Sequence, residues 1–292
     1  MSSNPRGRGI ALALLSAVGF STLGLFAKLI YSEGFGVVQT LAWRFTFAAV
    51  ILFAIVIIGK RPLPPRPGRV LLLGLFGFVP QAGLYFLTLS FLDPGITSLL
   101  LYTYPSFVLL LGLLLWKRRP RRVQVLALIL SLAGCVVAFW RQGSYPLTGL
   151  ILGVAVGFTY GAYLLASEKV LSGCDPLSST ALVMLVAALV YWAATLALGQ
   201  FRLPTSLISL AGLGGLALMA TVLPIAALFG SIGIIGAADA SLVSTLEPVL
   251  TVCLSALIIG ERLGPSQLAG GGLIVAAVVI IGISERRAAA AS

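Results

Sequence analysis

The sequence predicts an all-helical protein that crosses a membrane ten times, as two inverted repeats of five helices each. Three observations lead to this fold class. Apolar stretches of about twenty residues follow one another along the chain, and a helix of about that length crosses a 30 Å hydrocarbon core. A sequence pattern occurs twice, and corresponding loops of the two copies differ in positive charge.

The composition excludes an ordinary soluble protein. Hydrophobic residues make up 59% of the chain and charged residues only 9%, whereas a soluble domain carries roughly 25% charged residues. The alternating segments of an outer-membrane barrel are not visible. Because the basic residues behind the net charge of +11 lie in short loops beside the spans, they are typical of orientation signals. We expect the lipid bilayer, and not nucleic acid, as a partner.

Glycines, prolines and charges divide the apolar sequence into spans. The first stretch is too long for a signal peptide and is interpreted as a retained span. The ten expected spans are 9–30, 38–58, 70–90, 94–116, 123–140, 147–166, 177–198, 207–231, 237–259 and 265–284.

Two offsets define the repeat. Residues 17–21 (Ala-Val-Gly-Phe-Ser) return 138 positions later as 155–159 (Ala-Val-Gly-Phe-Thr), and eight residues between 98 and 136 return 143 positions later, Pro105 as Pro248 among them. The sequence therefore predicts a first repeat over 1–141 (spans one to five) and a second over 142–292 (spans six to ten).

Five spans are an odd number, so the second copy must enter the membrane from the opposite side. Loop 60–69 carries four basic residues and its counterpart 199–206 carries one; loop 117–122 carries five and its counterpart 260–264 carries one. Positive charge is retained on the cytoplasmic side of bacterial membrane proteins. Both termini are therefore expected in the cytoplasm.

Inverted repeats of this kind build alternating-access transporters with a site near the midplane. Pro105 and Pro248 stand near the middles of spans four and nine, where a proline removes a backbone hydrogen bond. They indicate either simple kinks or, as we favour, a pair of broken helices that gate a central site.

Polar residues at similar depth are the candidate substrate-binding residues. They share faces of spans three, four, six and nine: Gln81, Tyr85, Ser98, Tyr102, Tyr160, Tyr163 and Thr245. The tyrosines of span six are also compatible with an interfacial belt. Tyr104 joins Tyr102 only if the helix unwinds before Pro105.

Charges inside spans are expensive and indicate function. Glu247 has three open roles: proton coupling, binding of a substrate amine, or packing in its protonated form. Arg44 and Lys28 lie near span ends, so extension of their side chains to the surface is favoured. Asp93 and Asp239 begin spans and are expected to cap helix N-termini.

The stripe Gly149, Gly153, Gly157 and Gly161 on span six favours close helix packing, with a sliding surface as the alternative. The chain has no histidine, and its three cysteines show no metal-site or disulfide spacing. We expect no metal, no cofactor and no enzymatic activity.

The runs 244–249 (Ser-Thr-Leu-Glu-Pro-Val), 260–263 (Gly-Glu-Arg-Leu) and 267–274 (Gln-Leu-Ala-Gly-Gly-Gly-Leu-Ile) resemble the EamA-type repeat of the drug/metabolite transporter superfamily. The resemblance covers essentially the whole chain as two copies. The first copy departs from the second, with Tyr104 in place of Glu247 and Arg118 in place of Glu261. A symmetric role for an acidic pair is therefore not implied.

The resemblance implies an exporter of amino acids or related metabolites in the bacterial inner membrane. It implies a basket-like bundle whose central cavity is lined by spans one, three, four, six, eight and nine, which carry the seven candidate residues. Among the branches, the chain looks most like the YddG-type exporters of aromatic and other neutral amino acids.

Other functions are weighed against this one. Multidrug export and organic-anion exchange use the same fold, and the second would need a lysine or arginine deep in the cavity. An intramembrane enzyme and a structural assembly protein are remote alternatives. The sequence contains no phosphate-binding loop for ATP. It leaves open the substrates, the direction, proton coupling and the oligomeric state.

Overall fold

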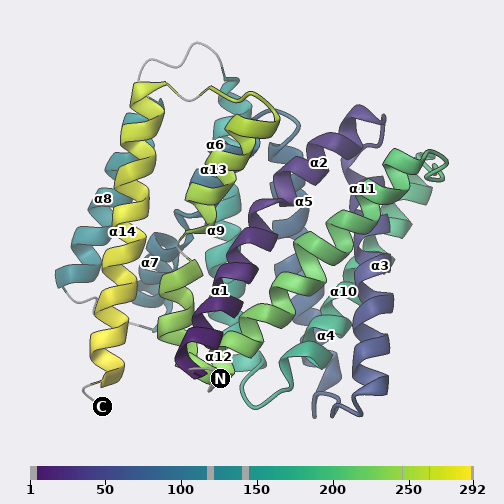
Figure 1. Ribbon diagram of the computed structural model, residues 1–292, viewed down its shortest axis with the longest axis horizontal. Coiled ribbons are helices and arrows are strands. Elements are labelled where there is room, and N and C mark those ends of the chain that lie inside the picture. The colour runs from purple at the N-terminus through teal and green to yellow at the C-terminus, as the bar shows by residue number, and fades with distance from the viewer. Residues whose placement is uncertain (1–4, 117–121, 140–144, 245, 263, 291–292) are drawn as a thin grey trace.

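The computed structural model describes residues 5–116, 122–139, 145–244, 246–262 and 264–290, and the regular elements in these ranges are all helices, with no strand. The first half contains α1 (Pro5–Ser21), α2 (Leu23–Ser32), α3 (Val37–Ile58), α4 (Pro67–Leu73), η1 (Gly74–Phe78), α5 (Val79–Thr88), α6 (Pro94–Leu101), α7 (Tyr104–Trp116) and α8 (Arg122–Phe139). The second half contains α9 (Leu147–Val170), α10 (Pro176–Ala197), α11 (Leu207–Ala217), η2 (Leu218–Val222), α12 (Leu223–Ser244), α13 (Glu247–Ile258) and α14 (Pro265–Ala290). Figure 1 shows how they form one bundle.

Seven segments of the described chain are long and apolar enough to cross a membrane: Pro5–Ser32, Val37–Ile58, Pro67–Thr88, Pro94–Leu115, Leu147–Ser167, Pro176–Ala197 and Leu207–Ile235. Val125–Gly134 and Glu247–Ile258 are shorter apolar helices. Exposed apolar side chains, such as Ile58 (82% exposed), cover the outside of the bundle, as expected of a surface that faces lipid. The prediction of an all-helical membrane protein is confirmed.

The expected boundary between spans eight and nine was wrong. No break occurs at 232–236, because α12 continues to Ser244. Asp239 therefore lies inside a helix and does not cap one. Glycines such as Gly233 and Gly236 lower helix stability by only about 1 kcal/mol each, and packing offsets this loss, so they do not end the helix.

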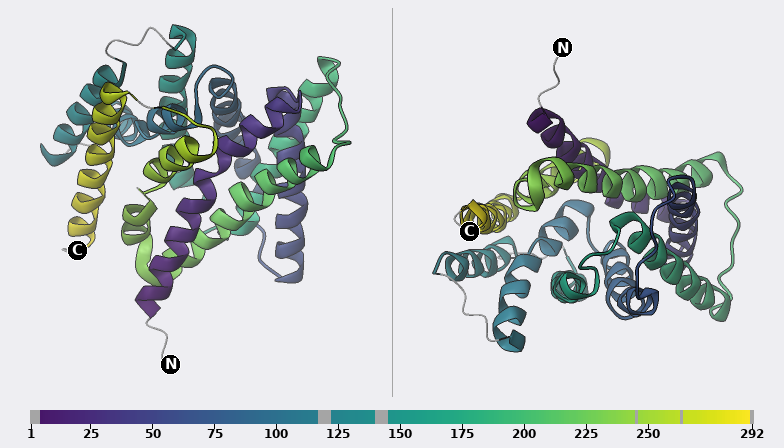
Figure 2. Two further views of the ribbon diagram at one scale, coloured as in Figure 1. Left: turned by 45° about the horizontal axis from the view of Figure 1, so that its top comes forward. Right: turned by 90° about the horizontal axis from the view of Figure 1, so that it is seen from below.

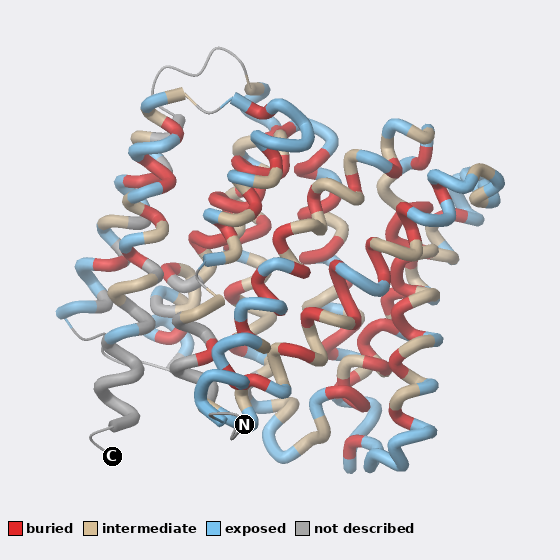
Figure 3. The backbone as a smooth tube through the Cα atoms, in the orientation of Figure 1, coloured by how far each residue is buried: buried red, intermediate tan, exposed pale blue. Residues whose placement is uncertain are grey.

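The two halves pack against each other helix by helix. α3 packs along α10, α1 along α12, and α8 along α14, so each contact joins one helix from each half. The largest buried apolar cluster lies between them and includes Leu41, Phe45 and Phe86. Figure 3 shows buried residues concentrated on the faces that the helices turn toward one another.

Counterpart loops lie at opposite ends of the bundle. The segment that follows α3 is at the lower end in Figure 1, whereas its counterpart after α10 is at the upper end, and the left view of Figure 2 agrees. α1 starts and α14 finishes at the lower end. The two copies therefore run in opposite directions, as the odd number of spans requires.

Two kinds of helix irregularity occur at matched positions. η1 and η2 are π-helical turns at the same place in spans three and eight, in which Val79 donates to the carbonyl of Gly74 and Leu223 to that of Leu218. Pro80 and Pro224 follow directly and lack an amide N–H. The wider turn accommodates the proline that an α-helix would exclude.

Spans four and nine are broken outright. α6 ends at Leu101 and α7 begins at Tyr104; α12 ends at Ser244 and α13 begins at Glu247. Pro105 and Pro248 are each the second residue of the new helix, where a proline is tolerated because that N–H needs no partner. The prolines thus mark helix starts, and the favoured expectation of a pair of broken helices is met.

Candidate functional site

The two helix breaks meet in the interior. The hydroxyl oxygen of Tyr102, in the first break, lies 2.9 Å from Oε2 of Glu247, the first residue after the second break. The same hydroxyl is 3.1 Å from the carbonyl oxygen of Ser244, which ends α12. Tyr102 is buried. Its single O–H proton is therefore within hydrogen-bonding reach of both the carboxylate and a carbonyl at the end of a helix.

Tyrosine rings extend from this point in a continuous series. The ring centroids of Tyr102 and Tyr104 are 5.9 Å apart, those of Tyr104 and Tyr160 are 4.9 Å apart at a steep angle, and those of Tyr160 and Tyr163 are 6.4 Å apart. Tyr104 reaches Tyr102 because the backbone unwinds between α6 and α7, which is the condition that the sequence set for this contact. Tyr160 thus lies against Tyr104 of α7, and Tyr163 lies against Tyr160 and, at 5.8 Å, against Phe78 of η1.

Gln81 and Tyr85 lie on α5, and both are buried. Neither side chain forms a hydrogen bond with another described residue, although Tyr85 lies close enough to Glu247 and Arg44 to interact electrostatically with both. Ser98 is buried in α6 with no hydrogen-bond partner for its hydroxyl among the described residues. Thr245 lies outside the described residues.

Arg44 is buried, and the expectation that it extends to the surface was wrong. Its side chain is 6% exposed. Nε donates a hydrogen bond of 3.0 Å to Thr221 Oγ1 in η2, and the guanidinium carbon lies 5.0 Å and 5.1 Å from the ring centroids of Phe45 and Phe86. Distance from a span end predicted extension, but α3 turns this face toward the other helices.

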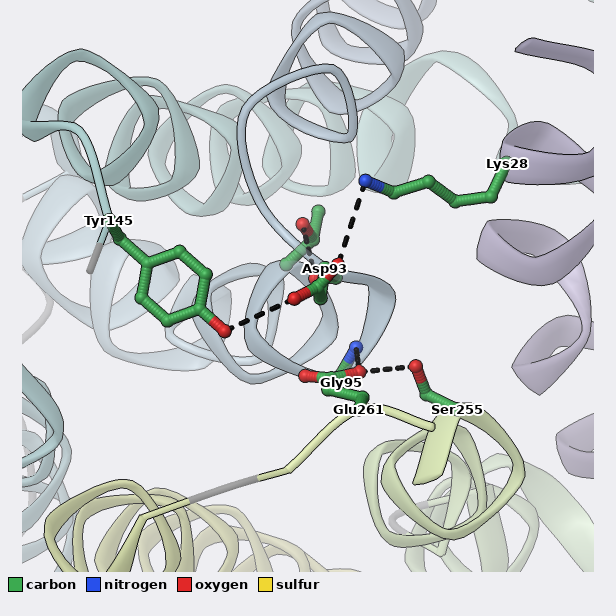
Figure 4. Close-up of polar contacts among 7 residues, drawn as sticks. Lys28, Asp93, Gly95, Tyr145, Ser255 and Glu261 are labelled. Carbon is green, nitrogen blue, oxygen red and sulfur yellow. Dashed lines mark hydrogen bonds and ion pairs between the residues drawn. The ribbon is translucent and has the colours of Figure 1, made fainter. Parts of the chain in front are cut away.

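A second polar cluster lies where the start of α6 meets the end of α13 (Figure 4). Glu261 accepts a hydrogen bond of 3.1 Å from the backbone N–H of Gly95 at the start of α6, and another from Ser255. Burial raises the pKa of Glu261 above its ordinary value, although these two donors oppose the shift. The sequence showed Glu261 only as part of a motif, since its partner lies 166 positions away.

Asp93 belongs to the same cluster. It occupies the N-cap position of α6 but makes no capping hydrogen bond. Its carboxylate instead lies 3.7 Å from Lys28 Nζ and accepts a hydrogen bond of 3.2 Å from the Tyr145 hydroxyl. The expected cap is therefore replaced by contacts between spans, and Lys28 is bound to a carboxylate.

The glycine stripe of α9 packs against the broken span four. A Cβ atom on Gly153 would lie 2.2 Å from Leu100 Cδ1, and one on Gly157 would lie 2.2 Å from Thr103 Oγ1 and 3.0 Å from the carbonyl oxygen of Leu100. Only a helix without side chains on this face can approach so closely. The packing interpretation is supported, and it brings Tyr160 of α9 to Tyr104.

The matches to known proteins agree with the two-copy architecture described above. The model of the EamA-like transporter family matches residues 7–140 and 147–283. An uncharacterized transporter of Bacillus subtilis, YcbK, is 26% identical over 96% of this chain and 93% of its own length, and one of Archaeoglobus fulgidus is 26% identical over 93% and 95%. An uncharacterized transporter of Synechocystis, 26% identical, is matched over 68% of this chain but only 61% of its own length.

A solved crystal structure shares the fold, with a TM-score of 0.70, 18% sequence identity, and coverage of 96% of this chain and 98% of its own. At that identity the likeness concerns the fold alone. The family match, in contrast, spans both halves of the sequence. The chain belongs to the EamA-like transporter family.

Proposed function

We propose that the protein is a secondary transporter of the bacterial inner membrane that exports aromatic and other neutral amino acids. Its family makes it a membrane transporter; the substrate, the direction and the membrane are the proposal. The supporting observation is the contact between Tyr102 and Glu247 beside the tyrosine series, where two broken helices meet in the interior.

The chemistry of this region suits an aromatic amino acid. Such a substrate carries an ammonium, a carboxylate and a flat ring. Glu247 and the Ser244 carbonyl would bind the ammonium, as unwound backbone does in other transporters with broken helices, and tyrosine rings would pack against the side chain. The proposed lining is Gln81, Tyr85, Ser98, Tyr102, Tyr160, Tyr163 and Thr245.

Opposite orientation of the two copies supports alternating access, in which one copy moves against the other around a fixed site. Pro105 and Pro248 would set the points at which spans four and nine bend. With no phosphate-binding loop in the sequence, substrate and ion gradients would supply the energy. Both termini, at the lower end in Figure 1, would face the cytoplasm.

A second candidate function is exchange of organic anions. The observation that favours it is the burial of Arg44, which supplies the deep cation that such a function needs. Multidrug export is the third, because aromatic rings with a carboxylate also bind hydrophobic cations.

The test is uptake of labelled compounds into liposomes that contain the purified protein. We expect saturable uptake of phenylalanine without ATP. Tyr85→Ala and Tyr102→Ala should weaken transport of phenylalanine more than that of alanine, by up to about tenfold for a lost ring contact. Gln81→Ala should weaken transport of both.

Trp192→Ala is the matched control. Trp192 packs against Trp43 and Phe201 near the loop after α10, so its loss should not change selectivity. Uptake of cationic drugs or dicarboxylates, but of no amino acid, would reject the substrate class. Equal behaviour of the tyrosine variants and Trp192→Ala would reject the location of the site.

A further inference from the structure

Arg44 is a buried cation, and the described residues use little of its hydrogen-bonding capacity. It lies roughly 10 Å along α3 from the start of that helix, and its side chain is 6% exposed. A guanidinium has five N–H donors. Of these, only Nε donates to a described residue, Thr221.

The described acidic side chains are all held elsewhere. Glu33 accepts from Ser206, Asp93 contacts Lys28 and Tyr145, and Asp175 pairs with Arg61. Glu247 binds Tyr102, and Glu261 binds Gly95 and Ser255. None of these five described carboxylates contacts Arg44, although a charge in the membrane interior is costly without a partner.

The surroundings of Arg44 fix the guanidinium in one orientation. Phe45 and Phe86 present their rings to it at about the distance of a cation–π contact. Thr221 holds the Nε edge, and its own hydroxyl donates to the carbonyl of Leu216 at 2.9 Å. The edge formed by the two Nη groups therefore remains for a ligand.

Tyr85 supplies a second donor near Arg44, because its ring centroid lies 6.0 Å from that of Phe86, the ring on which the guanidinium packs at 5.1 Å. It interacts electrostatically with Arg44 and with Glu247, and its hydroxyl has no hydrogen-bond partner among the described residues. Tyr31 and Tyr191, which also face Arg44, are different, because their hydroxyls donate to the carbonyls of Phe86 and Val79 at 2.7 Å. Only the Tyr85 hydroxyl, of these three, is open to a ligand.

We propose that the Nη edge of Arg44, together with the Tyr85 hydroxyl, binds a carboxylate group of the transported substrate. The assignment rests on the proposed function and adds the group that recognises the anionic end. A carboxylate fits this edge because its two oxygens accept two parallel N–H bonds from a guanidinium. A lysine would offer a point charge without that geometry. The site therefore selects substrates with a free carboxylate.

The experiment measures binding to the purified protein by titration calorimetry with three ligands of matched shape. Phenylalanine has both charged groups, phenylalaninamide lacks the carboxylate, and 3-phenylpropionate lacks the ammonium. We expect the amide to bind about tenfold to a hundredfold more weakly than phenylalanine, the range for loss of a charged hydrogen-bonded partner. Arg44→Gln should remove this difference, and Arg44→Lys should restore part of it.

Tyr85→Phe keeps the ring and removes only the hydroxyl, so it tests the site even if the Arg44 variants do not fold. It should weaken both carboxylate ligands severalfold and leave the amide unchanged. Tyr191→Phe is the control, because its hydroxyl already has a backbone partner and ligand selectivity should not change.

Different results would reject the carboxylate site at Arg44 and the proposed amino-acid substrate. If phenylalanine and its amide bind equally well to the wild-type protein, the carboxylate site is wrong while amino-acid binding stands. If 3-phenylpropionate binds through Arg44 but phenylalanine does not bind, the carboxylate site stands and the amino-acid substrate is wrong.

Discussion

The Tyr102 hydroxyl and the Glu247 carboxylate lie 2.9 Å apart and join the break in span four to the break in span nine. The two residues are 145 positions apart in the sequence and belong to different copies of the repeat. A change in the protonation of Glu247 would therefore act directly on the contact between the two copies.

Tyr102→Phe should impair transport. A hydrogen bond to a charged group contributes about 1.5–3 kcal/mol, so transport efficiency should fall roughly tenfold or more, with a shifted pH profile. Tyr191→Phe removes the same atom from a bond to a backbone carbonyl and should change stability only. Flux in proteoliposomes between about pH 5 and 9 checks this, and matching pH profiles for the two variants would contradict it.

Glu247→Gln tests proton coupling. If Glu247 carries the proton, the variant should lose pH-driven transport and keep downhill exchange of substrate, because an amide cannot release a proton in this range. The measurement compares uptake with and without an imposed pH gradient. Undiminished pH-driven uptake would assign Glu247 to packing, and loss of all binding would assign it to the substrate amine.

Single cysteines should be labelled from opposite sides of the membrane when placed in counterpart loops. Leu63 and Leu203 are suitable positions because they are 61% and 54% exposed. In a background without the three native cysteines, a membrane-impermeant maleimide added to intact cells should label Leu203→Cys and not Leu63→Cys. Labelling of both positions from one side would overturn the proposed membrane orientation.

Gly157→Ala should destabilise the protein. Its new methyl group would lie 3.0 Å from the Leu100 carbonyl oxygen and 2.2 Å from Thr103 Oγ1, a degree of overpacking that costs typically 1–3 kcal/mol. Gly214→Ala is the control, because nothing lies within 4 Å of that methyl group, and alanine there should be neutral or stabilising by about 0.5–1 kcal/mol. Thermal unfolding in detergent separates the two variants; equal melting temperatures would refute close packing.

Asp175 should stabilise the start of α10 in a pH-dependent way. It caps the helix through the N–H of Ser178 at 2.9 Å and pairs with Arg61 at 3.0 Å. Burial alone would raise the pKa of Asp175, but these contacts outweigh it and lower the pKa below its ordinary value. The stabilisation is therefore full above about pH 4, the unfolded value, and is lost as the pH falls through the lowered native pKa.

Asp175→Ala should cost about 1 kcal/mol at neutral pH, the usual loss of an N-cap. Asp175→Asn keeps a capping side chain and should cost less, since exposed ion pairs contribute under about 1 kcal/mol. Melting temperatures of both variants at pH 7 and pH 3 check this. A difference from wild type that grows toward low pH would contradict the sign.

Much of this structure follows from local sequence properties. The hydropathy of the sequence predicts the spans. The breaks at Pro105 and Pro248 follow from the missing amide N–H of proline. Unwinding at the first break also accounts for Tyr102 and Tyr104 lying together. In each case a short stretch of the chain determines the local structure, so the sequence was sufficient to predict that structure.

Other features depend on neighbours that the sequence does not identify. The burial of Arg44 depends on Thr221 and Phe86 of other spans, and the position of Glu261 depends on Gly95. The π turns were missed because Pro80 and Pro224 are compatible with a kink as well as with a wider turn. The uninterrupted α12 shows that packing can hold a glycine-containing segment in one helix.

Tyr104 and Glu247 occupy equivalent positions, each beginning the helix after a break. A rotation by 180° that superposes one copy on the other would therefore place the phenol of Tyr104 on the carboxylic acid of Glu247. In the proposed alternating-access cycle the two copies would exchange conformations, but the carboxylic acid would remain on the second copy. The carboxylic acid of Glu247 is thus a sequence difference between the duplicated halves, while the proposed motion would use the structure that the halves have in common.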